Sequence, residues 1–566
     1  MSFNHDFFKQ RRAGILLHPT SLPGTPGNGD LGKHAYNFVN FLSDCDISIW
    51  QMLPLGPTHQ DLSPYQCQSV HAANPLLINL ERLVDKGWLS EDSSPTTELE
   101  LEHELKRLTD QGWITEIPAE LELEHLLSLW SFQEKFCLQE GQNAAMRYRY
   151  ARLKEAGAGF LKHANTSDRA AITKFVETQA HWLEDYALFR ALQAEHLQTI
   201  RSECLPALEE IHSYDELKAR LTELIDLSGW WGWPPELRDR DPQALEEARH
   251  RNREVIEQHR FEQFVFFKQW YDLKRYANER GISLFGDIPI FVARDSVDVW
   301  ASRENFLLDA QSNPTVVTGV PPDYFSETGQ RWGNPHYNWD KMQADGFQWW
   351  LERFKTTSLL FDVVRIDHFR GFEASWFIPA SCETAIDGNW VKVPGDALFE
   401  KLQHSGINLP LVAEDLGIIT DEVRTLRDKF GLPGMKILQF AFDGDSNNAY
   451  LPHNHVENCV VYTGTHDNDT TLGWYQDLPA HLKHYVNEYL HASPHDMPWP
   501  LIEAAFASVA QLAIVPMQDV LCLDGNHRMN VPGIDEGNWQ WRFDWSQMPP
   551  GVHDRLQHFS HIYGRA

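Results

Sequence analysis

The stretch LLFDVVRIDHF, residues 359–369, is a short run of apolar, β-forming residues that ends in charged residues. Stretches with helical periodicity, such as 420–430 and 501–513, lie between most of the other runs of this kind. The other apolar runs that end in charged or turn residues number seven: AGILLHP (13–19), ISIWQMLPL (47–55), ISLFGDIPIFVA (282–293), LPLVAEDLG (409–417), MKILQFAFD (435–443), CVVYTGTHD (459–467) and VLCLDG (520–525). Eight strands separated mainly by helices predict a parallel (β/α)8 barrel. An open doubly wound sheet would show a similar order, but no GxGxxG turn follows any of these runs.

The long interval between the second and third runs has a different composition. It is rich in Glu, Leu, Arg and Gln, with helical spacing of apolar residues at 181–196 and a charged amphipathic helix expected at 94–108. We therefore expect an α/β protein in which residues 12–55 and 282–566 form a TIM barrel. Residues 56–281 are expected to form one or more inserted, mainly helical subdomains.

Charge and cysteine usage exclude several classes of function. The chain has 49 basic and 80 acidic residues, a formal charge of −31, which disfavours binding to nucleic acid or to an anionic membrane. The seven cysteines are scattered and form no CxxC pair, and the N-terminal MSFNHDFFKQRR has no apolar signal-peptide core. These features fit a cytoplasmic protein. His18, His59 and His71 are not at metal-ligand spacing, so we expect neither a metal nor an organic cofactor.

Charged residues recur at the ends of the predicted strands, where barrel enzymes carry their catalytic groups. They are Asp287, Arg365, Asp367, Glu414, Asp415, His466 and Asp467. An Asp at a strand end is also a common turn or helix-cap residue, and for any one of these taken alone that structural interpretation is favoured.

Three motifs give these residues a chemical interpretation. Arg365 and Asp367 are two residues apart, so they emerge on one face of a strand, where the guanidinium keeps the carboxylate ionised as a nucleophile requires. A partly enclosed Glu414 would keep its proton near neutral pH and act as an acid and then a base. Two carboxyls on neighbouring strands suit cleavage of a glycosidic bond, with retention if they lie about 5–5.5 Å apart. A structural Arg–Asp pair, and an Asx turn at His466–Asp467, are the alternatives.

The motifs, in their order, resemble those of the bacterial amylomaltases (4-α-glucanotransferases or disproportionating enzymes, glycoside hydrolase family 77). The resemblance extends from about residue 12 to 543. It is carried by HPTSLPG (18–24), SPYQ (63–66), GDIPIFVARDSVDVW (286–300), GVPPDYFSETGQRWGNP (319–335), RIDHFRG (365–371), AEDLG (413–417), GTHDND (464–469) and RMNVPG…GNWQWR (528–542).

This resemblance implies roles for individual residues. Asp367 corresponds to the nucleophile, Glu414 to the general acid/base and Asp467 to the stabiliser of the transition state. Residues implied to bind substrate are Ser63, Tyr65, Asp287, Tyr324, Trp332, Arg365, His368, His466 and Asn530. The substrates implied are maltooligosaccharides and α-1,4-glucans, among which the enzyme would move glucan segments by a retaining double displacement. The sequence leaves the oligomeric state open.

The segment 319–335 is rich in Gly, Pro and aromatic residues. Its composition fits an ordinary well-packed loop and a binding loop equally well; the resemblance implies a lid over bound glucan. Two alternatives to a transferase remain. One is an α-amylase-type hydrolase on the same barrel, and the other is a catalytically silent glucan-binding protein, against which the intact acids argue.

Overall fold

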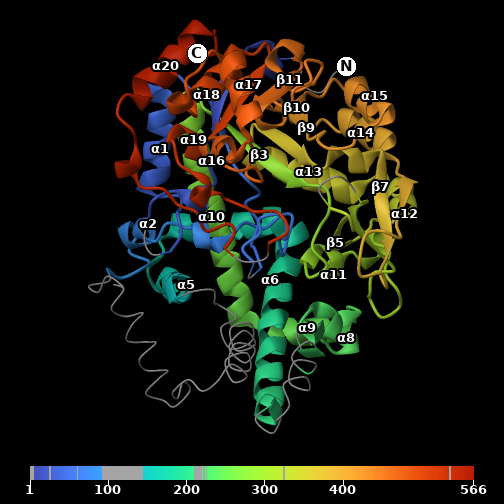
Figure 1. Ribbon diagram of the computed structural model, residues 1–566. Helices are drawn as coiled ribbons and strands as arrows, with labels where there is room; N and C mark the ends of the chain where they lie inside the picture. Colours follow the sequence, from blue (N-terminus) through green and yellow to red (C-terminus); the bar gives the residue numbers. More distant parts are fainter. Residues whose placement is uncertain are drawn as a thin grey trace, which may run out of the picture.

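Eight parallel strands form a nearly closed barrel in the computed structural model (Figure 1). The structure describes residues 6–24, 27–59, 61–91, 144–208, 226–322, 326–534 and 537–566, together with 220, 223 and 224. In spatial order the strands are β10 (Gly434–Ile437), β11 (Cys459–Tyr462), β12 (Leu512–Pro516), β1 (Arg12–Leu16), β2 (Ile49–Gln51), β3 (Ser283–Pro289), β6 (Val363–Asp367) and β9 (Leu411–Ala413). At the closure, the Ala413 N–H donates to the Pro433 carbonyl at 2.8 Å. The predicted (β/α)8 barrel is therefore confirmed.

Helices surround the strands because both faces of each strand are apolar. Side chains such as Phe285, Val363, Val412 and Tyr462 fill the barrel interior, and all four are buried. The other face of each strand packs against the helices of the outer layer. These are α1 (Lys33–Asp44), α10 (Arg253–Asn278), α13 (Gln348–Leu360), α14 (Gly395–His404), α15 (Asp421–Lys429), α16 (Thr471–Asp477), α17 (Ala480–Leu490), α18 (Trp499–Ala507), α19 (Met517–Val520) and α20 (Val552–Ile562).

One predicted strand was wrong. The run VLCLDG (520–525) begins at the last residue of the short helix α19 and continues into a turn, and the eighth strand is instead β12. The helical stretch expected at 501–513 ends earlier, because α18 stops at Ala507. Both runs are short and apolar, and periodicity cannot separate a buried strand from a buried helical turn in such runs.

A second sheet of four antiparallel strands stands beside the barrel, on the same side as β7 in Figure 1. Its strand order is β5 (Gln330–Pro335), β4 (Val316–Val320), β7 (Ala374–Pro379) and β8 (Asn389–Lys392). Strands β4 and β5 pair as a hairpin, and they contain both ends of the segment 319–335. This segment is therefore anchored on a sheet at both ends, and Tyr324 lies outside the described residues.

From Glu81 onward, the described part of the interval 56–281 is mainly helical. It contains α2 (Glu81–Asp85), α5 (Ala144–His163), α6 (Thr166–Leu208), α8 (Pro235–Arg238), α9 (Pro242–Arg251) and α10. The expected helix at 181–196 lies within α6, whereas the one at 94–108 is outside the described residues. Helices α6 and α10 pack together and project from the barrel (Figure 1). None of the described helices is long and apolar enough to cross a membrane.

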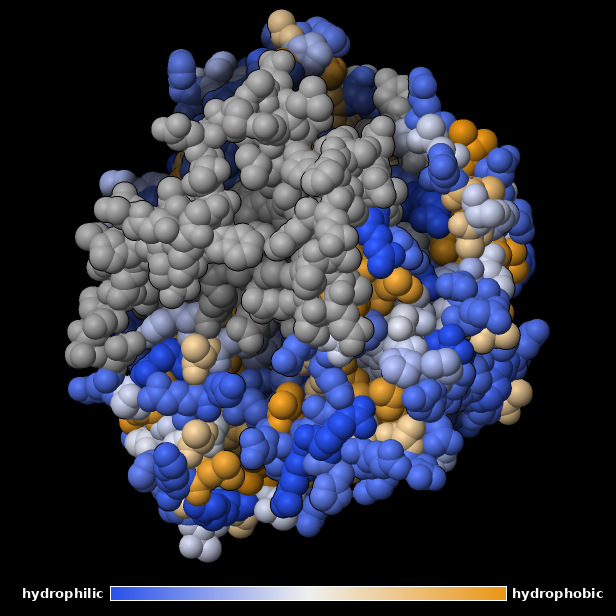
Figure 2. Space-filling model, turned by 90° about the horizontal axis from the view of Figure 1, so that it is seen from below, coloured by the Kyte–Doolittle hydropathy of each residue, from blue (hydrophilic) through white to orange (hydrophobic). Residues whose placement is uncertain are grey.

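Helix α10 joins this helical part to the barrel, since it contacts α6 as well as α1 and β3. Two of its buried glutamines also hold the segment after β2. The Gln263 side chain accepts from the Ala73 N–H at 2.9 Å and donates to the Ala73 carbonyl at 2.8 Å. Gln269 pairs in the same way with Asn79, at 2.8 and 3.0 Å. Seen from below, the described part of the surface is mostly hydrophilic, with hydrophobic residues scattered over it (Figure 2).

Candidate active site

Arg365 bridges two carboxylates at the carboxyl end of the barrel. It lies on β6, and its Nη1 is 2.6 Å from Asp287 Oδ2 on the neighbouring strand β3, while its Nη2 is 2.8 Å from Asp367 Oδ1. Arg365 is buried, and its side chain is 6% exposed against 29% for that of Asp367. Asp367 is therefore held beside a fixed positive charge while part of its carboxylate stays accessible, as a nucleophile requires.

Tyr65 is held in the site by Asp287. Its hydroxyl donates to Asp287 Oδ2 at 2.8 Å, so this one oxygen accepts from both Tyr65 and Arg365. The Tyr65 ring stacks on His466 with 5.0 Å between centroids and 13° between planes. Ser63 holds the backbone of Tyr65, because its Oγ accepts the Tyr65 backbone N–H at 3.3 Å. The predicted aromatic residue of SPYQ thus lies beside the predicted carboxylates.

Glu414 follows β9, directly beside the end of β6. Its Oε2 accepts the backbone N–H of His368 at 2.7 Å, and its Oε1 accepts that of Leu416 at 2.9 Å. Burial raises the pKa of Glu414 to about 7, against the opposing charge of Arg365. A carboxyl group of this kind remains protonated at near-neutral pH and can donate its proton to a leaving oxygen.

His368 places a neutral ring next to the carboxylates. Its backbone is left-handed, with φ 51°, an uncommon conformation for a residue with a side chain. Burial lowers the pKa of His368 to about 3, so the ring is uncharged. The buried Nε2 has no hydrogen-bond partner among the described residues. Trp332 of the β4–β5 hairpin contacts this ring edge-on, with 4.8 Å between centroids.

Asp467 lies on the loop after β11 and is held by two residues of the segment after α19. Asn530 Nδ2 donates to Asp467 Oδ1 at 2.7 Å, and Arg528 Nη2 donates to the Asp467 backbone carbonyl at 3.0 Å. The Asp467 side chain is 47% exposed, and its Oδ2 is 3.4 Å from His466 Nε2. Burial lowers the pKa of His466, although the Asp467 charge opposes this shift. The two strand-end acids and Asp467 therefore belong to one constellation.

Two residues beside the site were not predicted individually. Trp539 lies 6.0 Å from Tyr65 and 5.9 Å from His466 between ring centroids. Its backbone is left-handed, with φ 64°, which is unusual for so large a side chain. Arg528 holds the backbone of the Asp467 loop. Both residues lie in the RMNVPG…GNWQWR motif, so that motif was the signal that could have found them.

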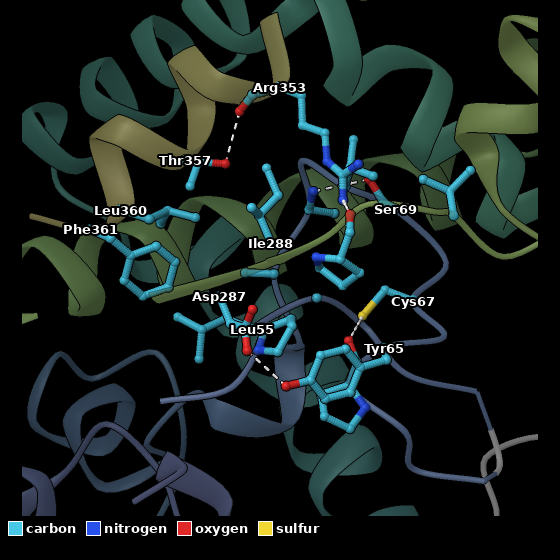
Figure 3. A pocket seen from close by; sticks show the side chains of 18 of the residues that line it. Leu55, Tyr65, Cys67, Ser69, Asp287, Ile288, Arg353, Thr357, Leu360 and Phe361 are labelled. Carbon is cyan, nitrogen blue, oxygen red and sulfur yellow. Dashed lines mark hydrogen bonds between the residues drawn. The ribbon is translucent and has the colours of Figure 1, made fainter. Parts of the chain in front are cut away.

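A cavity of about 60 Å³ is lined by Tyr65 and Asp287 but not by Asp367 or Glu414. Figure 3 shows Leu55, Tyr65 and Cys67 on one wall and Arg353, Thr357 and Phe361 of the α13 region on the other. Ligand-binding pockets measure roughly 300 Å³ or more, so this cavity is smaller than an ordinary ligand pocket. Among the described residues, no group of three or more His, Cys, Asp or Glu side chains is arranged to hold a metal ion.

Known proteins resemble the chain over most of its length. The sequence model of the family described as 4-alpha-glucanotransferase matches residues 17–547. The chain belongs to the 4-α-glucanotransferase family.

Relatives match this 4-α-glucanotransferase chain over nearly their whole length. The 4-alpha-glucanotransferase of Thermus thermophilus is 45% identical over 555 residues, which cover 97% of each chain. That of Synechocystis sp. is 41% identical over 564 residues, which cover 98% of each. Among solved structures, an amylomaltase from Streptococcus agalactiae in complex with acarbose superposes with a TM-score of 0.80 at 33% identity, covering 98% of this chain and 100% of that one. The hydrolase alternative is not favoured, since these relatives are named as transferases or amylomaltase.

Proposed function

We propose that the enzyme transfers α-1,4-glucan segments by a retaining double displacement at Asp367, Glu414 and Asp467. The observation that carries this proposal is the contrast between the first two acids. Asp367 lies 2.8 Å from the Arg365 guanidinium and is partly exposed. Glu414 is also half-buried, on the adjacent strand end, and burial raises its pKa to about 7. A carboxylate beside a guanidinium fits a nucleophile, and a neighbouring carboxyl with a raised pKa fits a general acid.

The reaction proceeds in two half-reactions. In the first, Glu414 donates its proton to the glycosidic oxygen while Asp367 attacks C1, so that the C1–O4 bond breaks and the donor glucan is held as an ester on Asp367. The departing chain leaves with that proton on the 4-hydroxyl of its non-reducing end. In the second, the carboxylate of Glu414 takes a proton from an acceptor 4-hydroxyl, which attacks C1 and releases Asp367. Asp467 accepts hydrogen bonds from sugar hydroxyls that tighten in the oxocarbenium-like transition state.

The other predicted binding residues surround this centre. We place the cleaved sugar between the Tyr65 side of the site and Glu414, with His368 Nε2 and His466 directed to its hydroxyls. Asp287 orients Arg365 and Tyr65, and its side chain is 1% exposed, so we infer that it acts on the sugar through those two residues. Asn530 holds Asp467 at 2.7 Å.

We assign the β4–β5 hairpin, with the segment 319–335, as a lid over the bound glucan. Trp332 supports this role, since it is half-buried and reaches His368 from the hairpin. Transfer and hydrolysis share the covalent intermediate and differ in whether a sugar hydroxyl or water reaches C1. A lid that covers the intermediate favours transfer. We also place the enzyme in the cytoplasm, acting on maltodextrins and glycogen-derived chains; the free thiols of Cys45, Cys67, Cys382, Cys459 and Cys522 fit that compartment.

Incubation with maltotriose tests the reaction directly. A transferase converts it to glucose and a ladder of longer maltodextrins, which chromatography resolves over time. The newly formed linkages should be α, as NMR of the anomeric protons would show. Release of glucose and maltose without any longer product would contradict the proposal and support the hydrolase alternative.

A further inference from the structure

A single buried carboxylate, that of Asp519, holds both ends of the loop that carries His466 and Asp467. The loop starts at Thr463, directly after β11, and ends at Thr471, the first residue of α16. Asp519 Oδ2 accepts from the hydroxyl of Thr463 at 2.7 Å and from that of Thr471 at 2.6 Å. Its Oδ1 accepts the Thr471 backbone N–H at 2.7 Å. Both carboxylate oxygens are therefore used to join the start of the loop to its end.

Asp519 is well suited to act as a fixed point. It is fully buried in α19, which begins directly after β12, so it is attached to a rigid barrel strand. Within the loop, Asn468 Oδ1 accepts the N–H and the hydroxyl of Thr465, both at 2.9 Å, so the loop forms a turn of its own. Contacts from outside come from Gln439, whose Nε2 donates to the Asp469 carbonyl at 2.8 Å, from Asn530, and from the Tyr65 ring stacked on His466. Asp519 joins both ends of this turn to the barrel.

We propose that Asp519 is a positioning residue for glucan transfer, which fixes both ends of the loop so that Asp467 and His466 meet the cleaved sugar in the reactive geometry. The inference rests on the proposed role of Asp467 as the stabiliser of the transition state. Interactions of this kind are sensitive to position, and a misplacement of about 1 Å costs roughly 100-fold in rate. Asp519 itself does not touch the substrate, because it is fully buried behind the loop.

The first experiment compares Asp519→Ala with Asp519→Asn, using glucose release from maltotriose and fluoride release from α-maltosyl fluoride. The alanine variant should lose roughly 10- to 100-fold in kcat with little change in KM, because the affected contact tightens in the transition state. The asparagine variant should recover most of the rate. Its Oδ1 still accepts the Thr471 N–H, and its Nδ2 can donate to both threonine hydroxyls once these rotate.

Asp362→Ala is the matched control. Asp362 also accepts from three donors, the Leu284 N–H at 2.8 Å, Asn278 Nδ2 at 2.9 Å and Lys274 at 3.2 Å. It precedes β6 at the opposite end of the barrel, where substitutions affect stability rather than catalysis. Asp362→Ala should therefore lower the thermal midpoint of unfolding and leave kcat unchanged. An equal loss of kcat in Asp362→Ala would show that the Asp519 effect is general destabilisation.

A double-mutant cycle separates positioning from structure. If Asp519 acts through Asp467, then Asp519→Ala should change kcat less than about threefold when it is made in the Asp467→Asn enzyme. The same 10-fold or larger loss in both backgrounds would overturn the inference. If Asp519→Ala does not fold, Thr463→Val and Thr471→Val each remove one hydroxyl from the clamp and take its place in the cycle. Near-normal turnover by Asp467→Asn alone would instead refute the proposed role of Asp467, so the two failures are distinguishable.

Discussion

The substitution Arg365→Lys tests whether the catalytic site depends on the forked geometry of the guanidinium or only on its charge. Arg365 uses two separate nitrogens, 2.6 Å from Asp287 and 2.8 Å from Asp367. The ammonium of lysine is a single point charge, and it reaches one of these carboxylates at a time. The variant thus keeps the charge and loses one of the two contacts.

The expected loss of activity in Arg365→Lys follows from the hydrogen bond that is lost. A buried hydrogen bond to a charged group contributes about 1.5–3 kcal/mol, and about 1.4 kcal/mol corresponds to a factor of ten. We therefore expect kcat/KM to fall roughly 10- to 150-fold. Most of the loss should appear in kcat, since Asp367 must be correctly placed for attack on C1. Arg365→Met removes the charge as well, leaves Asp287 and Asp367 unpaired beside each other, and should cost about 3–5 kcal/mol of stability.

The assay is the initial rate of glucose release from maltotriose, followed together with thermal unfolding. Arg565→Lys is the control for placing a lysine at a buried arginine position. Arg565 is fully buried and donates to main-chain carbonyls of α18 and of the first residue of β1, those of Phe506 at 2.7 Å and Arg12 at 3.0 Å. The substitution Arg565→Lys should lower stability and leave turnover unchanged. An Arg365→Lys enzyme with more than half of the wild-type kcat would refute the reasoning.

Three other substitutions test single roles. Asp367→Asn should reduce transfer roughly 10⁴- to 10⁶-fold while maltotriose binding, measured by calorimetry, persists; unchanged turnover would refute the nucleophile assignment. Glu414→Gln should remove the fall in wild-type maltotriose turnover that occurs as pH rises through about 7, and it should leave fluoride release from α-maltosyl fluoride much less affected, since fluoride needs no proton. The raised pKa of Glu414 also means that wild-type stability, relative to this variant, declines from about pH 4.5 to 7; a constant difference in unfolding midpoint would contradict the shift. Trp332→Ala should raise the hydrolysed fraction of products about threefold or more, and an unchanged product ratio would argue against the lid.

Much of the barrel could be predicted from sequence because its strands are short apolar runs that end in functional residues. VVRID and the run before Glu414 have this form, and both became strands. The eighth strand was missed for a physical reason. LAIVP (512–516) follows an Ala-rich helix and is followed at once by a helical turn, so its apolar residues merge with those of its neighbours. Pairing with β1 and β11, which makes it a strand, is a long-range interaction that local pattern does not contain.

The site shows the same division between local and long-range information. Asp367 and Glu414 were predictable as candidates from their places at strand ends, and the Arg365–Asp367 pair from its spacing. The hydrogen bond from Tyr65 to Asp287 joins residues 222 positions apart, so local pattern does not contain it. The family resemblance pointed to the two residues and not to the bond between them. Asp519 was missed because its partners are two threonines more than 45 positions earlier in the chain. Nothing in MQDV distinguishes a loop anchor from an ordinary acidic residue in the first turn of a helix.

Helix α10 sets a limit on how small this enzyme can be made. By sequence, the helical interval reads as a removable block between two barrel strands. Yet Gln263 and Gln269 of α10 bind the main chain of Ala73 and Asn79, within the same segment that carries Ser63 and Tyr65. A deletion that joined β2 directly to β3 would therefore discard part of the catalytic site together with the block. A minimal enzyme therefore has to keep residues 56–79 and the whole of Arg253–Asn278.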